Sequence, residues 1–524
     1  MAKKPVITVY DTTLRDGAQT KGISFSLEDK LRIAAELDAM GVPYIEAGWP
    51  SANPKDREFY TRIRGMKFKT ARIVAFGSTH RPGVTPAKDP AFKALLQVEP
   101  SAACIVGKAS SLHVRDVLRI SNNDNLKLIG NTVKYLKSKG LEVFFDAEHF
   151  FDGFSLDPDY ALQCLGAAQD AGADALALCD TNGGALPWDI ETVVRIVRGS
   201  LSAPIGIHVH NDSGTAVAAT LAAVRAGAAQ VQGTINGYGE RCGNADLCAI
   251  IANLSLKMGY ETIPRKNIAR LAPFARMVSE LANRPLPANS PFVGASAFTH
   301  KAGFHADAVR KNPATYEHIK PESVGNERGM LVSDQSGKAN VLAMAERMNI
   351  PLDAAAVKKV LARLKEAEFR GYQYDGAEGS FEILVRKTLG SFKPFFDLEG
   401  LRIVVTKRRR TGEIFSEASI AVRMGDKREF TAAEGDGPVN ALDNALRKAL
   451  EPMFPSLEDM RLTDYKVRVL DERAGTAAGV RVLITSRDSY ASWTTVGVSE
   501  NVIEASWLAL VDSIELKLLR ESAK

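Results

Sequence analysis

The sequence lacks the long apolar segments that would place a protein in a membrane. No apolar run in its 524 residues approaches the ~18 residues that a membrane-spanning helix needs. The first apolar stretch ends at Asp11 and is too short for the core of a signal peptide. We therefore expect a cytoplasmic protein that has no membrane partner.

Cysteine is also scarce, and neither sign of charge is in large excess. The five cysteines are scattered and form no Cys-x-x-Cys pair, which indicates reduced thiols rather than a disulfide framework. The 67 basic and 62 acidic residues leave a net charge of +5, too small and dispersed to indicate a nucleic-acid partner. The remaining composition, 45% hydrophobic and 25% charged, is that of an ordinary globular protein.

The first half of the chain alternates short apolar runs with segments of helical periodicity. Between the runs, apolar residues lie three and four positions apart, as in Leu27, Leu31 and Ala34, with Ser26 as a helix cap and Gly41 as a stop. Strands that alternate with helices form parallel sheets, and eight units predict a closed (β/α)8 TIM barrel, which takes ~250 residues. An open doubly wound sheet is the alternative, but no Gly-x-Gly-x-x-Gly motif follows the first run. The runs are VITVYDTTLRDG, VPYIEAGWP, ARIVAFGS, AACIVGK, LEVFFDAEH, ADALALCDTNGG, PIGIHVHND and AAQVQGTINGYGE.

The second half of the chain has two further patterns. Helical segments around Ile268–Ala282 and Leu352–Glu366 flank a loop-rich stretch, which indicates small helical subdomains. From residue 398 onward, three strand-like segments and a helix occur twice, so the tail reads as two βββα units. We expect the barrel at 1–275, helical linker subdomains at 276–395 and an α+β domain at 396–524.

Each apolar run of the barrel ends in polar residues or glycine. In a (β/α)8 barrel the carboxyl ends of the strands form the catalytic face. His208 and His210 lie two positions apart at such an end, so their imidazoles share one face of a strand and are well placed to bind one metal ion. A pair of hydrogen-bonded structural histidines is the alternative.

Asp16 lies at the end of the first run, just after the expected strand, and stands beside Arg15. Alone it would read as half of a strand-end ion pair. Barrel closure places the first strand beside the eighth and next but one to the seventh, so Asp16 can converge with His208 and His210. Two imidazoles and a carboxylate make a site with open positions for Zn²⁺, Mn²⁺ or Mg²⁺ acting as a Lewis acid. Asn244, in the loop after the last run, can add a carbonyl oxygen, unless this glycine-rich loop is a plain turn or a phosphate cradle.

Two more strand ends carry candidate polar groups. Glu148 ends the fifth run, with Asp146 two positions earlier on the same face, and one of these carboxylates is a candidate general base. A salt-bridged structural acid is the alternative. Thr181 ends the sixth run and either binds a substrate carboxylate or serves as a helix cap or turn hydroxyl.

Two longer motifs resemble the signatures of a known family. LRDGAQ at 14–19, followed by Lys30, and IGIHVHNDSGTAVA at 205–218 are similar to the two signatures of the isopropylmalate, homocitrate and citramalate synthases. The resemblance covers the whole chain, because that family also has linker subdomains and a C-terminal regulatory domain. The segments most similar to the citramalate synthase branch are EAGWPSANPKD, FDAEHFFDG, GTINGYGERCGNADL and WTTVGVSENVIEASW.

The resemblance implies a divalent metal held by Asp16, His208, His210 and Asn244. This metal would chelate the keto oxygen and the carboxylate of a 2-oxo acid. Arg15 would donate to the same keto oxygen and stabilise the alkoxide that develops there.

The resemblance also implies roles for residues in two parts of the chain. Thr181 would hold the substrate carboxylate, and Glu148 would remove a methyl proton from acetyl-CoA. His305 would assist Glu148, and Tyr316 would complete that group. His305 lies outside the barrel, and the family's linker subdomain reaches over the active site of the other protomer, so the resemblance implies a homodimer. From the residues alone, a surface or packing histidine is the alternative for His305.

The implied reaction condenses acetyl-CoA with pyruvate and water to citramalate and CoA, for a threonine-independent route to isoleucine, with the tail as a sensor of isoleucine. The nearest alternatives use 2-oxoisovalerate (isopropylmalate synthase) or 2-oxoglutarate (homocitrate synthase). Phe76 and Ile105, at strand ends, are candidates for the apolar wall that selects the oxo acid. Carbon–carbon cleavage by a related lyase and a non-catalytic amino-acid-binding protein are more distant alternatives.

Overall fold

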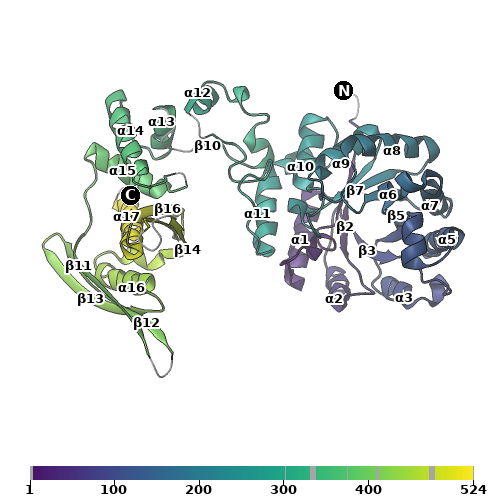
Figure 1. Cartoon of the computed structure of the whole chain (residues 1–524), viewed down its shortest axis with the longest axis horizontal. Coiled ribbons are helices and arrows are strands. Elements are labelled where there is room, and N and C mark those ends of the chain that lie inside the picture. The colour runs from purple at the N-terminus through teal and green to yellow at the C-terminus, as the bar shows by residue number, and fades with distance from the viewer. Residues whose placement is uncertain are drawn as a thin grey trace. The chain divides into compact units, whose positions relative to one another are not determined.

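The computed structural model describes residues 4–300, 303–330, 338–374, 376–408, 412–470 and 478–522. The chain forms two compact units (Figure 1). The first contains the chain up to Phe298 together with Ile319–Arg328, and the second contains Thr299–His318 and the chain from Gly329 onward. In the described residues, every helix is too short or too polar to span a bilayer.

The first unit is a closed barrel of eight parallel strands in the order β1 to β8. The barrel closes where β1 pairs with β8, with Val9 opposite Val231. The predicted (β/α)8 barrel is therefore confirmed. Its strands are β1 (Thr8–Asp11), β2 (Tyr44–Gly48), β3 (Arg72–Ser78), β4 (Ala102–Lys108), β5 (Glu142–Glu148), β6 (Ala175–Asp180), β7 (Ile205–Val209) and β8 (Gln230–Gly233).

Helices cover the outside of the barrel, and their ends follow local sequence rules. The first helix begins after Ser26, whose side chain forms a capping box with Asp29, and ends at Gly41 in the left-handed region (φ 86°), as predicted. The helices of this unit are α1 (Leu27–Met40), α2 (Pro54–Ile63), α3 (Pro90–Gln97), α4 (Ser111–His113), α5 (Asn122–Ser138), α6 (Phe150–Leu156), α7 (Pro158–Asp170), α8 (Pro187–Ser200), α9 (Ala216–Ala226), α10 (Leu247–Ala252) and α11 (Leu271–Leu281).

The barrel strands bury side chains on both faces, so they divide the apolar residues into two layers. Alternate residues point to opposite faces of a strand. Tyr10, Phe76, Cys104 and Phe144 belong to a small cluster inside the barrel. Ile105 belongs instead to the large cluster between the strands and the helices.

The second unit contains a mainly helical part, which is followed along the chain by two three-stranded antiparallel sheets. Each sheet is followed by one helix, which confirms the two predicted βββα units. Short strands β9 (Thr299–His300) and β10 (Gly329–Met330) pair with each other. The helices are α12 (Gly303–Lys311), α13 (Lys338–Arg347), α14 (Ala354–Phe369) and α15 (Glu378–Leu389). The βββα units are β11 (Asp397–Lys407), β12 (Ile414–Met424), β13 (Lys427–Gly435) and α16 (Pro438–Leu450), then β14 (Arg461–Val469), β15 (Val480–Arg487), β16 (Ser492–Ser499) and α17 (Val502–Ser522).

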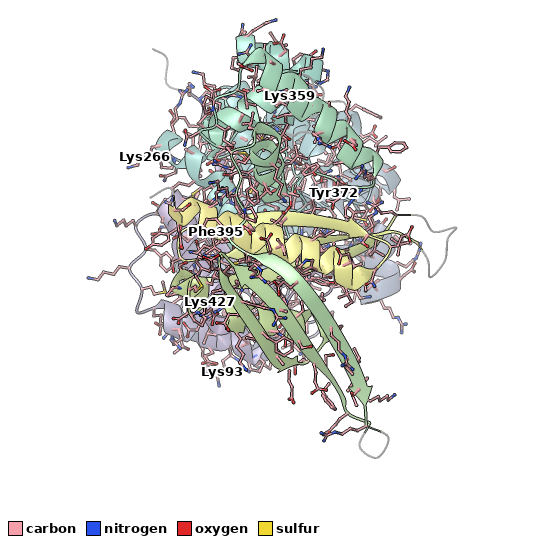
Figure 2. The ribbon with its side chains drawn as sticks, turned by 90° about the vertical axis from the view of Figure 1, so that its left-hand side faces the viewer. Lys93, Lys266, Lys359, Tyr372, Phe395 and Lys427 are labelled. Carbon is pink, nitrogen blue, oxygen red and sulfur yellow. The ribbon has the colours of Figure 1, made fainter. Side chains whose placement is uncertain are left out.

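The two βββα units share one apolar core. Leu446 of α16 and Ile484 of β15 belong to the same buried cluster. The fully buried Trp493 donates its indole N–H to the Ser513 hydroxyl at 2.9 Å. Phe395, labelled beside the yellow helix α17 in Figure 2, donates its backbone N–H to Glu515 at 3.0 Å. The expected boundary at 275 falls within α11, and the one at 395 falls between α15 and β11. Both boundaries stay predictions.

Candidate active site

A cavity of about 490 Å³ opens at the carboxyl ends of the barrel strands. This is the face on which the sequence pattern places the polar groups. Most of the expected site residues lie in its lining: Arg15, Asp16, Glu148, Thr181, His208 and His210.

Asp16, His208 and His210 lie together in this cavity, and all three are buried. The Asp16 Oδ2 atom is 3.4 Å from His208 Nε2 and 4.0 Å from His210 Nε2. The two Nε2 atoms are 3.4 Å apart. Two ligands that each lie about 2.1 Å from one metal ion are separated by about 3 to 3.5 Å. Two of the three separations fall in this range, and the third is shorter than the roughly 4.2 Å between two such ligands on opposite sides of an ion, so the three atoms can bind a single divalent cation.

Asn244 is the candidate for a fourth donor, and it stands beside His210 rather than in the described lining of the cavity. It pairs with His210 in an isolated antiparallel bridge, which places the two backbones side by side. Its Nδ2 atom donates to the Tyr238 carbonyl at 3.0 Å, whereas its Oδ1 atom is buried and has no hydrogen-bond partner among the described residues. Burying a polar oxygen that has no hydrogen-bond partner costs free energy. This carbonyl oxygen is therefore suited to act as a metal ligand.

The local charges favour an anionic Asp16 and a neutral His210. Burial alone would raise the pKa of Asp16, but Arg15 and the neighbouring His208 outweigh burial and hold it well below its usual range. Burial and the neighbouring His208 lower the pKa of His210 to about 4. Burial also lowers the pKa of His208, but Asp16 outweighs this effect and raises it. A carboxylate and a neutral imidazole are the forms that bind metal.

A buried carboxylate that the sequence analysis did not single out holds Arg15 in place. The Arg15 Nε–H donates to Glu46 at 2.5 Å, and Arg15 Nη1 donates to Asp16 at 3.1 Å. The other carboxylate oxygen of Glu46 accepts from the Tyr10 hydroxyl at 2.7 Å. The guanidinium carbon lies 4.0 Å from the centre of the Phe76 ring. Arg15 is therefore fixed on three sides and faces the cavity in one orientation.

Glu148 and Asp146, the two carboxylates of the fifth strand, have different surroundings. Glu148 lines the cavity and forms an ion pair with Lys108, a partner that the sequence pattern does not reveal. Asp146 is buried and accepts a hydrogen bond from Gln232 at 3.0 Å. Both residues line the cavity, but Glu148 is the more exposed of the two and is therefore the carboxylate that is more open to a substrate.

Thr181 lies beside Glu148 at the end of β6. Its hydroxyl oxygen accepts the backbone N–H of His149 at 2.8 Å. His149 has a positive φ of 57°, a backbone conformation that residues other than glycine seldom adopt. Backbone strain of this kind clusters at functional sites. The Thr181 hydroxyl hydrogen stays available to donate into the cavity.

Family models match almost the whole chain in three consecutive parts. The HMGL-like model covers residues 6–277, the homocitrate synthase post-HMGL domain-like model covers 292–371, and the LeuA allosteric (dimerisation) domain model covers 375–518. Proteins named (R)-citramalate synthase are similar over nearly their full length. The one from Geobacter sulfurreducens is 53% identical, with 98% of each chain covered. Those from Aquifex aeolicus (99% of each chain) and Synechocystis (98% of this chain, 97% of the relative) are 51% and 49% identical.

The chain belongs to the (R)-citramalate synthase family. These relatives favour the citramalate branch over the isopropylmalate and homocitrate synthases that the sequence analysis left open. The predicted TIM-barrel fold and transferase class agree with this membership.

In this citramalate synthase family member, one of the two expected wall residues lines the cavity. Phe76 does so, but Ile105 does not, since its side chain packs in the layer between strands and helices. The expectation for Ile105 is wrong because residues alternate along a strand, and the neighbouring Val106 takes the position at the cavity. Trp49 and Leu118 also line the cavity, although the sequence analysis did not single them out.

His305 and Tyr316 belong to the second unit, whereas the described lining of the barrel cavity comes from the first. The structure brings these two residues together, with ring centroids 4.3 Å apart and planes inclined by 34°. His305 is exposed, and Tyr316 is 41% exposed. Their expected catalytic role stays a prediction.

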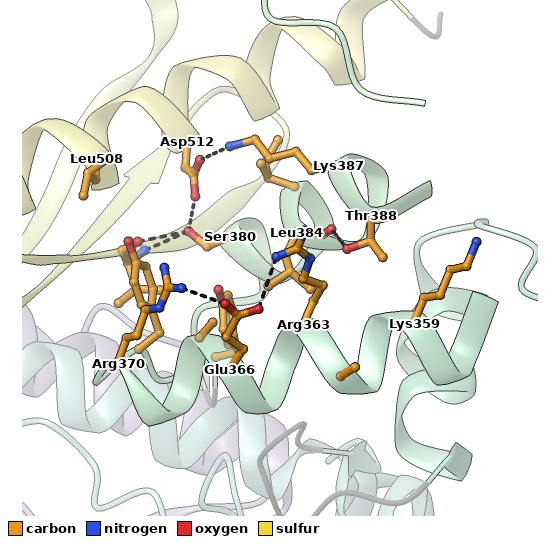
Figure 3. Close-up of a pocket in the computed structure, with 16 residues that line it drawn as sticks. Lys359, Arg363, Glu366, Arg370, Ser380, Leu384, Lys387, Thr388, Leu508 and Asp512 are labelled. Atoms are coloured by element: carbon orange, nitrogen blue, oxygen red, sulfur yellow. Dashed lines mark hydrogen bonds and ion pairs between the residues drawn. The ribbon is translucent and has the colours of Figure 1, made fainter. Parts of the chain in front are cut away.

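A larger cavity, of about 710 Å³, lies in the second unit of this family member between α14, α15 and α17 (Figure 3). Its lining contains two ion pairs and a hydrogen bond: Arg370 donates to Glu366 at 2.6 Å, Lys387 donates to Asp512 at 3.4 Å, and the Ser380 hydroxyl donates to Asp512 at 2.7 Å. None of the expected site residues lies in its described lining. In the described structure, the candidate metal-binding and acid–base side chains converge in the barrel cavity and not in this one.

Proposed function

We propose that the protein condenses acetyl-CoA with pyruvate and water to give (R)-citramalate and CoA. One observation carries the proposal: a buried carboxylate and two imidazoles converge at the mouth of the barrel in a chain that shares 53% identity with a named (R)-citramalate synthase. The reaction supplies carbon for isoleucine synthesis without threonine, and we propose that it occurs in the cytoplasm.

Asp16, His208, His210 and Asn244 are proposed to hold one divalent cation, either Mn²⁺, Mg²⁺ or Zn²⁺. The orphaned Oδ1 atom of Asn244 and the spacing of the other three donor atoms support this assignment. When bound, the cation supplies Lewis-acid polarisation of the pyruvate keto group.

Arg15 and Thr181 are proposed to bind pyruvate. A guanidinium has five N–H donors, of which Glu46 and Asp16 each take one, so others remain for the keto oxygen. Glu46 keeps the guanidinium in place before the reaction begins, so no reorganisation is needed when negative charge develops on that oxygen. The Thr181 hydroxyl donates to the pyruvate carboxylate.

Glu148 is proposed to be the general base that takes a methyl proton from acetyl-CoA. The carbon that loses the proton attacks the keto carbon of pyruvate, and the new alkoxide forms beside Arg15. Water then cleaves the thioester, and CoA leaves as the thiol. Lys108 forms an ion pair with Glu148, and this ion pair would have to open before the acetyl group could approach the carboxylate.

His305 and Tyr316 are proposed to assist Glu148 from the linker of a partner subunit. This assignment rests on the family resemblance and makes the active form a dimer. The match of residues 375–518 to an allosteric dimerisation domain supports both the dimer and the proposal that isoleucine inhibits the enzyme through this domain.

The test is CoA release from acetyl-CoA with pyruvate, 2-oxoisovalerate or 2-oxoglutarate as partner. We expect pyruvate to have the highest kcat/KM, and chelation of metal or a His208→Ala change to abolish turnover. Equal or better turnover with 2-oxoisovalerate would exclude the citramalate assignment, and full activity in metal-free protein would exclude the mechanism. A chain that ends near residue 395 should keep some activity and lose inhibition by isoleucine. Unchanged inhibition would place the effector elsewhere.

A further inference from the structure

A chain of hydrogen bonds runs from one of the two histidines into the interior of the barrel. Gln232 of β8 stands opposite His208 of β7 in the register of the sheet. Its Oε1 atom is 3.0 Å from His208 Nδ1, and its Nε2 atom is 3.0 Å from Asp146 Oδ1 on β5. All three residues are buried, since His208 is 5% exposed, Gln232 0% and Asp146 3%. Water therefore does not compete for these hydrogen bonds.

This arrangement determines which way the Gln232 amide faces. A carboxylate accepts hydrogen bonds and does not donate them. The Asp146 carboxylate therefore requires the NH₂ group of Gln232 on its side, which leaves the amide oxygen on the side of His208. An oxygen at that position accepts a hydrogen bond, so the proton of a neutral His208 must be on Nδ1. The lone pair of Nε2 then points toward Asp16 and His210.

His210 has no corresponding support. Its Nδ1 atom is buried and makes no hydrogen bond to any residue that the structure describes. The two imidazoles of the site are therefore not equivalent. A hydrogen bond to Gln232 orients the ring of His208 before any metal binds, whereas no such bond orients the ring of His210 in the described structure.

We propose that Gln232, oriented by Asp146, is a positioning residue that holds His208 with its proton on Nδ1 and its Nε2 atom ready to bind the divalent cation. The inference rests on the metal site of the proposed function. Removal of an outer hydrogen-bond partner of a metal-binding histidine typically weakens metal affinity by about 10- to 100-fold.

The same strand offers a matched control. Gln230 lies two residues before Gln232 on the same face of β8 and is also buried, at 3% exposure. Its Oε1 atom accepts a long hydrogen bond from Gln232 Nε2 at 3.5 Å, and it makes no hydrogen bond to a histidine in the part of the chain that the structure describes. Gln232→Leu and Gln230→Leu therefore remove the same group from the same part of the core, and only the first removes the support of His208.

The experiment measures Mn²⁺ binding to the metal-free full-length protein by titration calorimetry. In parallel, the His208 tautomer is read from the nitrogen-15 spectrum of protein labelled at its eight histidines, with the peak assigned by His208→Gln. We expect Gln232→Leu to bind Mn²⁺ about 10- to 100-fold more weakly and to lose the single Nδ1–H tautomer. Gln230→Leu should stay within threefold of the unmodified protein in affinity.

Asp146→Asn tests the other half of the chain and keeps the proposal falsifiable if Gln232→Leu does not fold. An asparagine can either donate or accept, so the Gln232 amide is free to turn over, and we expect a mixture of His208 tautomers. The proposal is overturned if Gln232→Leu binds Mn²⁺ as Gln230→Leu does, or if either Gln232→Leu or Asp146→Asn keeps a single Nδ1–H tautomer. If the unmodified protein binds no Mn²⁺, or turns over without metal, the proposed function fails as well, so the two failures are distinguishable.

Discussion

The buried ion pair of Lys30 and Asp56 joins two helices to the catalytic end of β2. Lys30 Nζ, on α1, is 2.6 Å from Asp56 Oδ1, on α2, and donates to the Ala47 carbonyl at 3.2 Å. The other carboxylate oxygen of Asp56 accepts the backbone N–H of Trp49 at 2.9 Å. Lys30 and Asp56 are 5% and 6% exposed, and Trp49 lines the active-site cavity. The pair therefore stabilises the segment that carries Trp49.

The substitution Lys30→Met keeps the apolar stem and removes the ammonium group. It leaves Asp56 buried with a charge that no cation compensates, and such a change costs about 3–5 kcal/mol. The Trp49 N–H still donates to Asp56, so we expect the lower end of that range. About 3 kcal/mol corresponds to roughly two orders of magnitude in the opening equilibrium of this segment.

Hydrogen exchange of the full-length protein, read by mass spectrometry, measures the opening of each segment separately. Peptides from 27–63 should lose about 100-fold in protection. Peptides from α16 in the second unit should not change. Adding Asp56→Asn to Lys30→Met removes the unpaired charge and should restore at least half of the lost free energy.

The exposed pair between Arg62 and Glu28 is a matched control, because it joins the same two helices at 2.9 Å with side chains 51% and 72% exposed. Arg62→Met should change protection less than fivefold, as expected for a surface pair. The reasoning is refuted if Lys30→Met changes protection no more than Arg62→Met does.

Three further predictions concern the site and the second unit. Arg15→Lys should lower kcat for CoA release by about 10²–10³, because one ammonium cannot replace the fixed guanidinium donors, and a loss below tenfold would contradict the assigned role. Burial raises the pKa of Glu515 to about 7 in the folded protein. The stability that its protonated carboxyl contributes is therefore fully present below the ordinary pKa near 4.5 and is lost as the pH rises through 7. Glu515→Gln should therefore raise the thermal midpoint more at pH 8 than at pH 5, and equal shifts would disprove this account. A Cβ at Gly497 would lie 2.0 Å from the Ala505 carbonyl, whereas one at Gly479 would meet nothing within 4 Å. Gly497→Ala should accordingly lower the thermal midpoint of the second unit and Gly479→Ala should not, a contrast that scanning calorimetry can measure.

The barrel and its repeat of strands and helices were predictable because their signals are local. Period-two and period-3.6 patterns mark strands and helices, and the capping box of Ser26 with Asp29 and the stop at Gly41 occur where the sequence predicts them. The convergence of Asp16, His208 and His210 followed from the same patterns together with the closure of the barrel.

The outward position of Ile105 and the supporting residues of the site were not predictable. A sequence shows that residues alternate along β4 but not which set faces the axis of the barrel, and Ile105 was therefore placed on the wrong face. Glu46, Lys108 and Gln232 look like ordinary strand residues. Their roles come from partners 31, 40 and 86 positions away, namely Arg15, Glu148 and Asp146.

The sequence by itself thus determined the order of elements, the catalytic face and the residue types that can bind a cation, since these depend on neighbouring positions and on one rule of closure. Only the tertiary structure decided that Glu148 is open to the cavity whereas Asp146 is buried at its edge and supports Gln232. It also decided that a hydrogen bond to Gln232 holds the ring of His208, with no corresponding bond to His210 Nδ1 among the described residues. The physical reason is that these differences arise from contacts across the barrel. Side chains from strands that are not hydrogen-bonded to each other meet in the barrel interior. Burial strengthens the hydrogen bonds between them, because water is excluded.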